Sequence, residues 1–177
     1  SDLIQRHQNY FPELEAEAER LWKDAHLDDE DLFGALAGYL EKRLKVRVRV
    51  LTVSEMGGAV RRFDPERREL WISEVLRRGS RNFQLAHQAG LLTCSDTLDL
   101  MSRDSALTSE EARSLCRVAL ANYFAAAVLT PYQEFQQAAE ALRYDLDLLG
   151  HRFRVSYEQV CQRLTTLNRK GARGVPF

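Results

Sequence analysis

The segment from about Ser109 to Leu129 is apolar on nearly every side, and it constrains the fold more than any other feature of the sequence. Thr108 and Glu111 form a capping box that predicts where its helix begins, and Thr130-Pro131 ends it. A helix that is hydrophobic all round is stable only when other elements surround it. We therefore expect a mostly helical domain built around this buried helix.

The other periodic segments indicate which elements surround it. Apolar residues recur at helical spacing over about 12–25, 31–44, 82–91, 132–149 and 156–167. Alternating residues indicate strands at 46–50, 59–63 and 69–73, separated by turns at Gly57-Gly58 and at Asp64-Pro65. The predicted fold class is α+β, mostly α, with a small three-stranded antiparallel sheet wedged between helices.

The charge pattern restricts the kinds of partner. The net charge is only −1, yet residues 1–41 are acidic and residues 42–81 are rich in arginine. A local basic cluster suits a compact anion better than a long nucleic acid, although a solvated basic face would look the same. The chain has three widely spaced cysteines, and no signal peptide or membrane-length apolar run is seen. We therefore expect one cytoplasmic domain that does not enter a membrane.

Residues 83–91 (FQLAHQAGL) resemble a damaged zinc-peptidase motif. Such a site needs two histidines one helical turn apart and a glutamate base beside the first histidine. Here His87 fills the first position, Gln88 stands at the base position, and Leu91 replaces the second histidine. An amide cannot accept a proton at neutral pH, and a leucine offers no lone pair to a metal.

Residues 121–131 (ANYFAAAVLTP) resemble the second signature helix of the IrrE- and ImmA-type metallopeptidases, which have a zincin-like fold. In that family a glutamate just before the Ala-Asn pair is the third metal ligand, and this chain has Leu120 there. Two of three ligands and the base are thus missing. We expect no metal in this chain and no enzymatic activity, with His87 acting as a core or pocket histidine.

A narrower resemblance is carried by residues 81–88 (RNFQLAHQ), 107–113 (LTSEEAR), 116–117 (CR), 160–167 (VCQRLTTL) and 171–177 (GARGVPF). These blocks are similar to the short-chain fatty acyl transcriptional regulators (RamB- and PrpR-like). The resemblance implies an IrrE-like centre over 1–167, with 168–177 starting a linker to a further domain. It also implies acyl-CoA sensing in propionate or glyoxylate metabolism, and contact with DNA through a helix-turn-helix outside this chain.

Coenzyme A as the bound effector needs arginine or lysine groups for its phosphates. The candidates are the strand arginines Arg47, Arg49, Arg61 and Arg62, together with Arg169 and Lys170 after the last helix. The strand arginines could converge on one phosphate, or could be solvated and bridge to the acidic first helix. Arg169 and Lys170 could equally be part of a solvated linker.

An acyl or pantetheine chain needs an apolar slot with a few polar anchors. The predicted lining is His87, Gln88, Leu91, Leu120 and Tyr123, with the Tyr123 hydroxyl meeting the thioester or amide. Ordinary core packing is the alternative for Tyr123.

The leading hypothesis is therefore a ligand-sensing regulatory domain that forms a homodimer. The alternatives are a divergent metallopeptidase, or a dimerisation module with no small ligand.

Overall fold

A computed structural model of the chain describes residues 9–103 and 107–176. Residues 1–8 and 104–106 of the predicted domain, and Phe177 of the predicted linker, lie outside the described residues. The helices are α2 (Pro12–Asp24), α3 (Leu32–Lys42), α4 (Val53–Met56), α5 (Arg78–Thr93), α6 (Ser95–Ser102), α7 (Glu110–Leu129), α8 (Tyr132–Ala141), α9 (Leu146–Phe153) and α10 (Tyr157–Leu164). The strands are β1 (Arg47–Leu51), β2 (Arg61–Asp64) and β3 (Glu69–Ser73). The predicted α+β, mostly helical class is confirmed.

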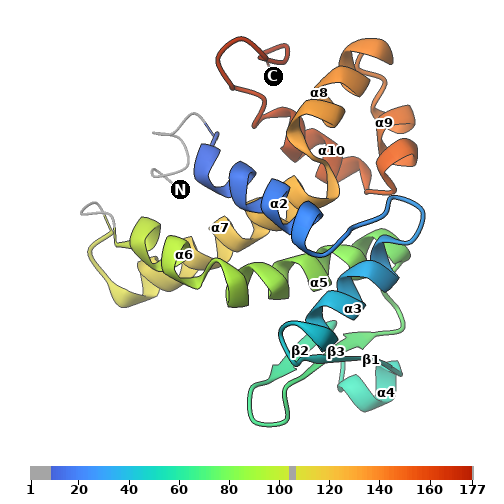
Figure 1. Cartoon of the computed structure of the whole chain (residues 1–177), viewed down its shortest axis with the longest axis vertical. Coiled ribbons are helices and arrows are strands. Elements are labelled where there is room, and N and C mark those ends of the chain that lie inside the picture. Colours follow the sequence, from blue (N-terminus) through green and yellow to red (C-terminus); the bar gives the residue numbers. More distant parts are fainter. Residues whose placement is uncertain (1–8, 104–106, 177) are drawn as a thin grey trace.

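Helix α7 is the centre of the larger core, as its composition predicts, and it packs against α2, α5 and α6 (Figure 1). Leu120 and Phe124 are completely buried. The burial is not complete all round, because Leu115 and Val118 in the first half of the helix are largely exposed. The helix is capped by Ser109, whose side chain accepts a hydrogen bond from the Ala112 amide, and not by Thr108.

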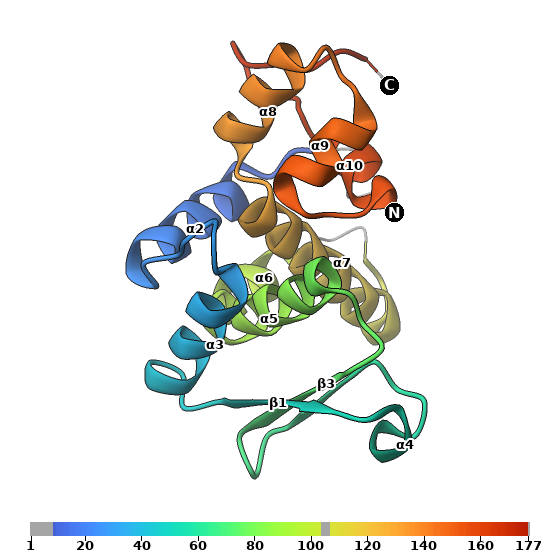
Figure 2. The same cartoon turned by 90° about the vertical axis from the view of Figure 1, so that its right-hand side faces the viewer.

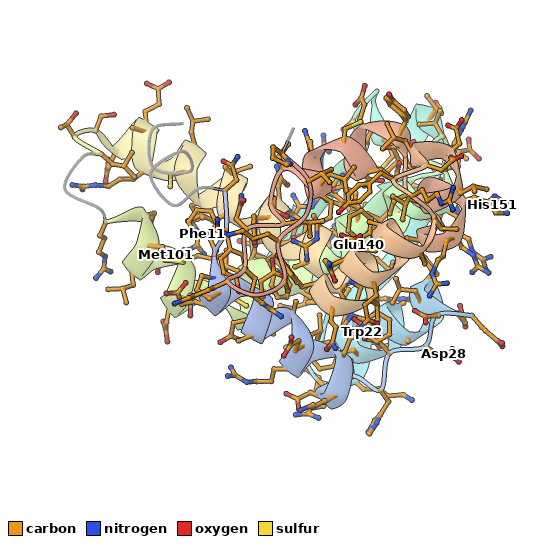
Figure 3. All side chains as sticks on the ribbon, turned by 90° about the horizontal axis from the view of Figure 1, so that it is seen from above. Phe11, Trp22, Asp28, Met101, Glu140 and His151 are labelled. Atoms are coloured by element: carbon orange, nitrogen blue, oxygen red, sulfur yellow. The ribbon has the colours of Figure 1, made fainter. Side chains whose placement is uncertain are left out.

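A second, smaller core lies between α8, α9 and α10, at the top of Figures 1 and 2. The sequence predicts one helix over 132–149, but Arg143 and Tyr144 both have positive φ and divide it into α8 and α9. Seen from above, His151 on α9 and Met101 on α6 lie at opposite ends of the molecule (Figure 3). The two cores are joined by the α7–α8 corner at Pro131.

The sheet is mixed, and the prediction of an antiparallel meander is wrong. The strand order is β1-β3-β2, with β1 parallel and β2 antiparallel to β3. The reason lies in α4, which Thr52 and Glu55 start with a capping box. Gly57 (φ 59°) and Gly58 (φ 84°) end this short helix and do not make a hairpin, so the chain crosses over before β2 and β3 pair.

Helices α3 and α5 lie above one face of the sheet in Figure 2, and the strand register decides which residues face them. Val48, Leu70 and Phe63 are aligned across the three strands and pack in or against the larger core. Side chains one residue away on each strand point to the opposite face, because strand side chains alternate. This alternation separates arginines that the sequence places close together.

No single helix within the described ranges is long and apolar enough to cross a membrane. Among the described helices, α7 and α8 pass that test only when taken together, and they are bent by 62° relative to each other.

Candidate functional site

The degenerate metal motif lies on α5, and Arg61 of β2 is the group that faces it. A guanidinium nitrogen of Arg61 donates a hydrogen bond to the side-chain oxygen of Gln88, the residue at the position of the peptidase base. Gln88 is only 2% exposed, and Arg61 is half-buried. The register explains this contact, since Arg61 is paired with the buried Ile72 and so lies on the helix-covered face of the sheet. A positively charged group thus sits beside the former catalytic position.

His87 is the one metal ligand that the motif retains, and it is buried at 7% exposure. Burial and the nearby Arg61 charge lower the pKa of His87 to about 4, although a hydrogen bond with the Asn122 side chain opposes the fall. The imidazole is therefore neutral at neutral pH. Its Nδ1 atom is buried without a hydrogen-bond partner among the described residues.

The two leucines at the lost ligand positions lie in or against the larger core and do not line a common slot. Leu120 is completely buried, and Leu91 is partly buried against the same cluster. Between them α5 and α7 approach closely at Gly90, which lies against the Phe124 ring. The predicted pocket of five residues is therefore not assembled as expected. Across the part of the chain that the structure describes, no three His, Cys, Asp or Glu side chains come together to hold a metal.

Tyr123 faces α2 and α10, and its hydroxyl is already occupied. The hydroxyl donates to a carboxylate oxygen of Glu15 and accepts a hydrogen bond from the Phe11 amide at 3.2 Å. Burial and the neighbouring Glu15 carboxylate raise the pKa of Tyr123 well above its ordinary value. The expectation that this hydroxyl meets a thioester is thus not supported by its hydrogen bonds.

Glu15 and Arg163 form a buried ion pair that the sequence reasoning missed. Both side chains are at most 2% exposed, and two guanidinium nitrogens of Arg163 donate to the two carboxylate oxygens at 2.8 and 2.7 Å. Arg163 also donates to the Thr130 carbonyl at 3.0 Å, and its guanidinium carbon lies 5.8 Å from the Tyr123 ring centre and 5.6 Å from that of Tyr132. The sequence carries one signal for this pair. Glu15 on α2 and Arg163 on α10 each stand beside apolar residues on the buried side of their helix.

A cavity of about 380 Å³ lies beside this network, between the start of α5, the second half of α7 and α10. It is lined by Asn9, Phe83, Ala119, Asn122, Tyr123, Ala126, Leu129, Thr130, Val155, Gln159, Gln162, Arg163, Thr165 and Thr166. Of the five predicted slot residues only Tyr123 is in this lining. The cavity nevertheless adjoins the degenerate motif, because Asn122 bonds His87 and Phe83 lies one helical turn before it.

The six predicted phosphate ligands do not form one group. Three of them lie on the open face of the sheet: Arg47, Arg49 and Arg62. There a guanidinium nitrogen of Arg49 lies 3.4 Å from a carboxylate oxygen of Glu69. Arg61 lies on the opposite face, so the side chains of Arg47 and Arg61 do not converge on one phosphate group as expected. The alternative expectation is an ion pair between these arginines and the acidic first helix. Arg49 instead pairs with Glu69 of β3, within the sheet.

Arg169 and Lys170 lie at the other end of the molecule from the sheet and belong to the folded unit. The Arg169 guanidinium lies 4.2 Å from the Tyr132 ring centre and donates to the Tyr10 hydroxyl at 2.8 Å. Lys170 is exposed. The Tyr132 hydroxyl donates to the Ala172 carbonyl at 2.9 Å, so residues beyond 167 pack on α8. Whether they also lead into a further domain stays a prediction.

Comparison with known proteins identifies the scaffold. Residues 41–165 match the family model of the IrrE N-terminal-like domain, Peptidase_M78. The chain belongs to this family. A solved structure of a Mycobacterium tuberculosis transcriptional regulator is similar with a TM-score of 0.93 at 39% identity, over 99% of this chain and 53% of that chain.

The curated relatives are named as regulators. The HTH-type transcriptional regulator PrpR of Mycobacterium tuberculosis is 40% identical over 99% of this chain, and RamB of the same species is 38% identical over 99%. The propionyl-CoA carboxylase regulator of Cereibacter sphaeroides is 48% identical over 55% of this chain. The chain spans 36% of PrpR, 37% of RamB and 21% of the Cereibacter protein. The RamB- and PrpR-like resemblance is thereby confirmed.

Proposed function

We propose that this domain senses CoA or a short acyl-CoA for a transcriptional regulator of short-chain fatty acid or propionate metabolism, and that it catalyses no hydrolysis. The observation that carries the proposal is the loss of the base and of two metal ligands on an intact IrrE-type scaffold, with Gln88, Leu91 and Leu120 in their places. The names of the relatives support a regulatory role. The regulator would act in the cytoplasm as a homodimer and contact DNA through a helix-turn-helix domain of the longer protein.

The cavity beside Tyr123 is the part of the structure that best fits an acyl or pantetheine chain. Aliphatic groups of Ala119, Ala126 and Leu129 line one side, and amide and hydroxyl groups of α10 and the residues after it line the other. Such a lining can hold an apolar chain and hydrogen bond to an amide or thioester oxygen. This placement replaces the slot around Leu91 and Leu120.

The phosphates of CoA have candidate ligands near this cavity. Arg169 and Lys170 follow Thr165 and Thr166, which line it, and Arg169 bonds Tyr10 beside the lining residue Asn9. Arginine and lysine side chains bind phosphate oxygens through charge-assisted hydrogen bonds. The arginines on the open face of the sheet are not in the lining of this cavity: Arg47, Arg49 and Arg62.

Filling the cavity tests the proposal. The substitution Ala126→Phe puts a ring into the cavity and is expected to weaken binding of propionyl-CoA at least tenfold, because the acyl chain and the ring compete for the same space. The measurement is isothermal titration of propionyl-CoA into each purified variant. Ala16→Phe on the exposed side of α2 is the matched control and should leave the affinity unchanged.

Two results would oppose the proposal. Equal affinity in the Ala126→Phe and Ala16→Phe variants would exclude this cavity as the acyl site. The absence of any heat from CoA or propionyl-CoA with the unmodified chain would favour a dimerisation module without a small ligand.

A further inference from the structure

Arg61 carries a charge that the protein leaves uncompensated. Its guanidinium donates a hydrogen bond to the neutral side-chain oxygen of Gln88, and its Nε atom is buried without a partner among the described residues. Across residues 9–103 and 107–176, no Asp or Glu forms an ion pair with it. Burial lowers the pKa of Arg61, yet a guanidinium stays charged at neutral pH. The site therefore holds a half-buried positive charge with no negative partner.

Such an arrangement is costly in an unliganded protein. Removing a charged group from water is unfavourable unless an opposite charge and full hydrogen bonding replace the water. The chain shows the usual solution elsewhere, because the fully buried Arg163 has the Glu15 carboxylate and several further acceptors. Arg163 has its negative partner within the chain, whereas Arg61 has none among the described residues. This contrast indicates that the partner of Arg61 is an anion from outside the chain.

The surroundings of Arg61 offer further free hydrogen-bonding capacity. The His87 ring, on the same turn of α5 as Gln88, has a buried Nδ1 atom with no partner among the described residues. Its other neighbour is the side chain of Asn122, an amide that can act as donor or acceptor, so the imidazole can adopt either tautomer. A ligand oxygen here could therefore accept hydrogen bonds from Arg61 and from the ring.

We propose that the degenerate metal site binds a small oxyanion, with the Arg61 guanidinium supplying the positive charge that a zinc ion supplies in the active peptidases. The inference goes beyond the proposed function and does not depend on acyl-CoA binding. Two sources share this chemistry: the carboxylate of a free short-chain acid, and a phosphate group. The planar fork of a guanidinium matches a carboxylate, and the adjoining cavity is lined by Phe83, Ala119 and Ala126 on the side next to Asn122, which suits a short aliphatic tail.

The test compares ligand-induced shifts in the melting temperature of the 177-residue chain at constant ionic strength. The probes are sodium propionate, inorganic phosphate and sodium chloride, and the variants are Arg61→Met and Arg67→Met. Arg67 is an exposed arginine of the same β2–β3 hairpin and serves as the matched control. We expect propionate to raise the melting temperature of the unmodified chain and of Arg67→Met, and to bind at least tenfold more weakly to Arg61→Met.

A second variant keeps the proposal testable if Arg61→Met fails to fold. Gln88→Glu places a carboxylate beside the guanidinium, and we expect this internal partner to abolish the response to external anions while the chain stays folded. A response to phosphate alone, lost in either variant, supports the oxyanion site and assigns it to a phosphate group. Responses to propionate and phosphate that match chloride, or that survive in both variants, overturn the proposal. An unchanged propionyl-CoA affinity in Gln88→Glu would leave the proposed function standing.

Discussion

Replacing Glu15 with alanine is expected to lower the free energy of unfolding by about 3–5 kcal/mol, because it leaves the completely buried Arg163 guanidinium without its negative partner. It also removes the acceptor of the Tyr123 hydroxyl. The three side chains come from α2, α7 and α10, so the loss should loosen the junction between the two cores. Urea unfolding followed by circular dichroism measures the effect.

Two controls separate the ion pair from a general effect on α2. Glu13→Ala alters an exposed glutamate in the first turn of the same helix and should change stability by less than about 1 kcal/mol. Replacing both Glu15 and Arg163 with methionine should recover part of the loss, since no unpaired charge then remains buried. If Glu15→Ala proves as mild as Glu13→Ala, the described ion pair does not hold the two cores together.

Gly90→Ala is expected to destabilise the chain by about 1–3 kcal/mol, although alanine normally favours a helix over glycine. A Cβ atom at residue 90 would lie 2.4 Å from the Cδ1 atom of Phe124. Phe124 is completely buried and cannot move away without disturbing the core. The penalty from this clash therefore exceeds the gain in helix propensity.

Gly38→Ala is the matched comparison and should have the opposite sign. Gly38 lies inside α3, and a Cβ atom there would meet nothing within 4 Å. Its substitution should stabilise the chain by about 0.5–1 kcal/mol through helix propensity alone. Thermal unfolding of the two variants side by side gives the signs directly. A stabilising Gly90→Ala would contradict the close approach of α5 and α7 that shapes the degenerate site.

The sequence predicts the central helix and the damaged motif because both are local patterns. The apolar composition of residues 109–129 marks α7 as a buried helix, and the positions of His87, Gln88 and Leu91 lie within about one turn of α5. The sheet topology is harder, since Gly57-Gly58 is a turn signal for a hairpin as well as for the end of α4. Only the pairing of β1 with β3 distinguishes the two, and pairing between distant segments leaves no local pattern.

The candidate site shows the same division between local and distant information. The sequence suggests Arg61 and Arg62 as phosphate ligands of one group, but strand alternation places their side chains on opposite faces of the sheet, and this determines which groups each can meet. The Glu15–Arg163 contact joins residues 148 positions apart and could not be foreseen from either segment alone. Its presence also explains why the Tyr123 hydroxyl is not free for a ligand.

Native mass spectrometry of the purified chain tests the central claim most directly, because one spectrum distinguishes a bound metal from a bound CoA thioester. With zinc and propionyl-CoA both present in excess, we expect a single added mass of one propionyl-CoA and no stoichiometric zinc. We expect no zinc because Leu91 and Leu120 stand where two of the three metal ligands would be, and a leucine side chain cannot bind a metal. A spectrum with one zinc ion per chain and no propionyl-CoA would contradict the account and favour a divergent metallopeptidase.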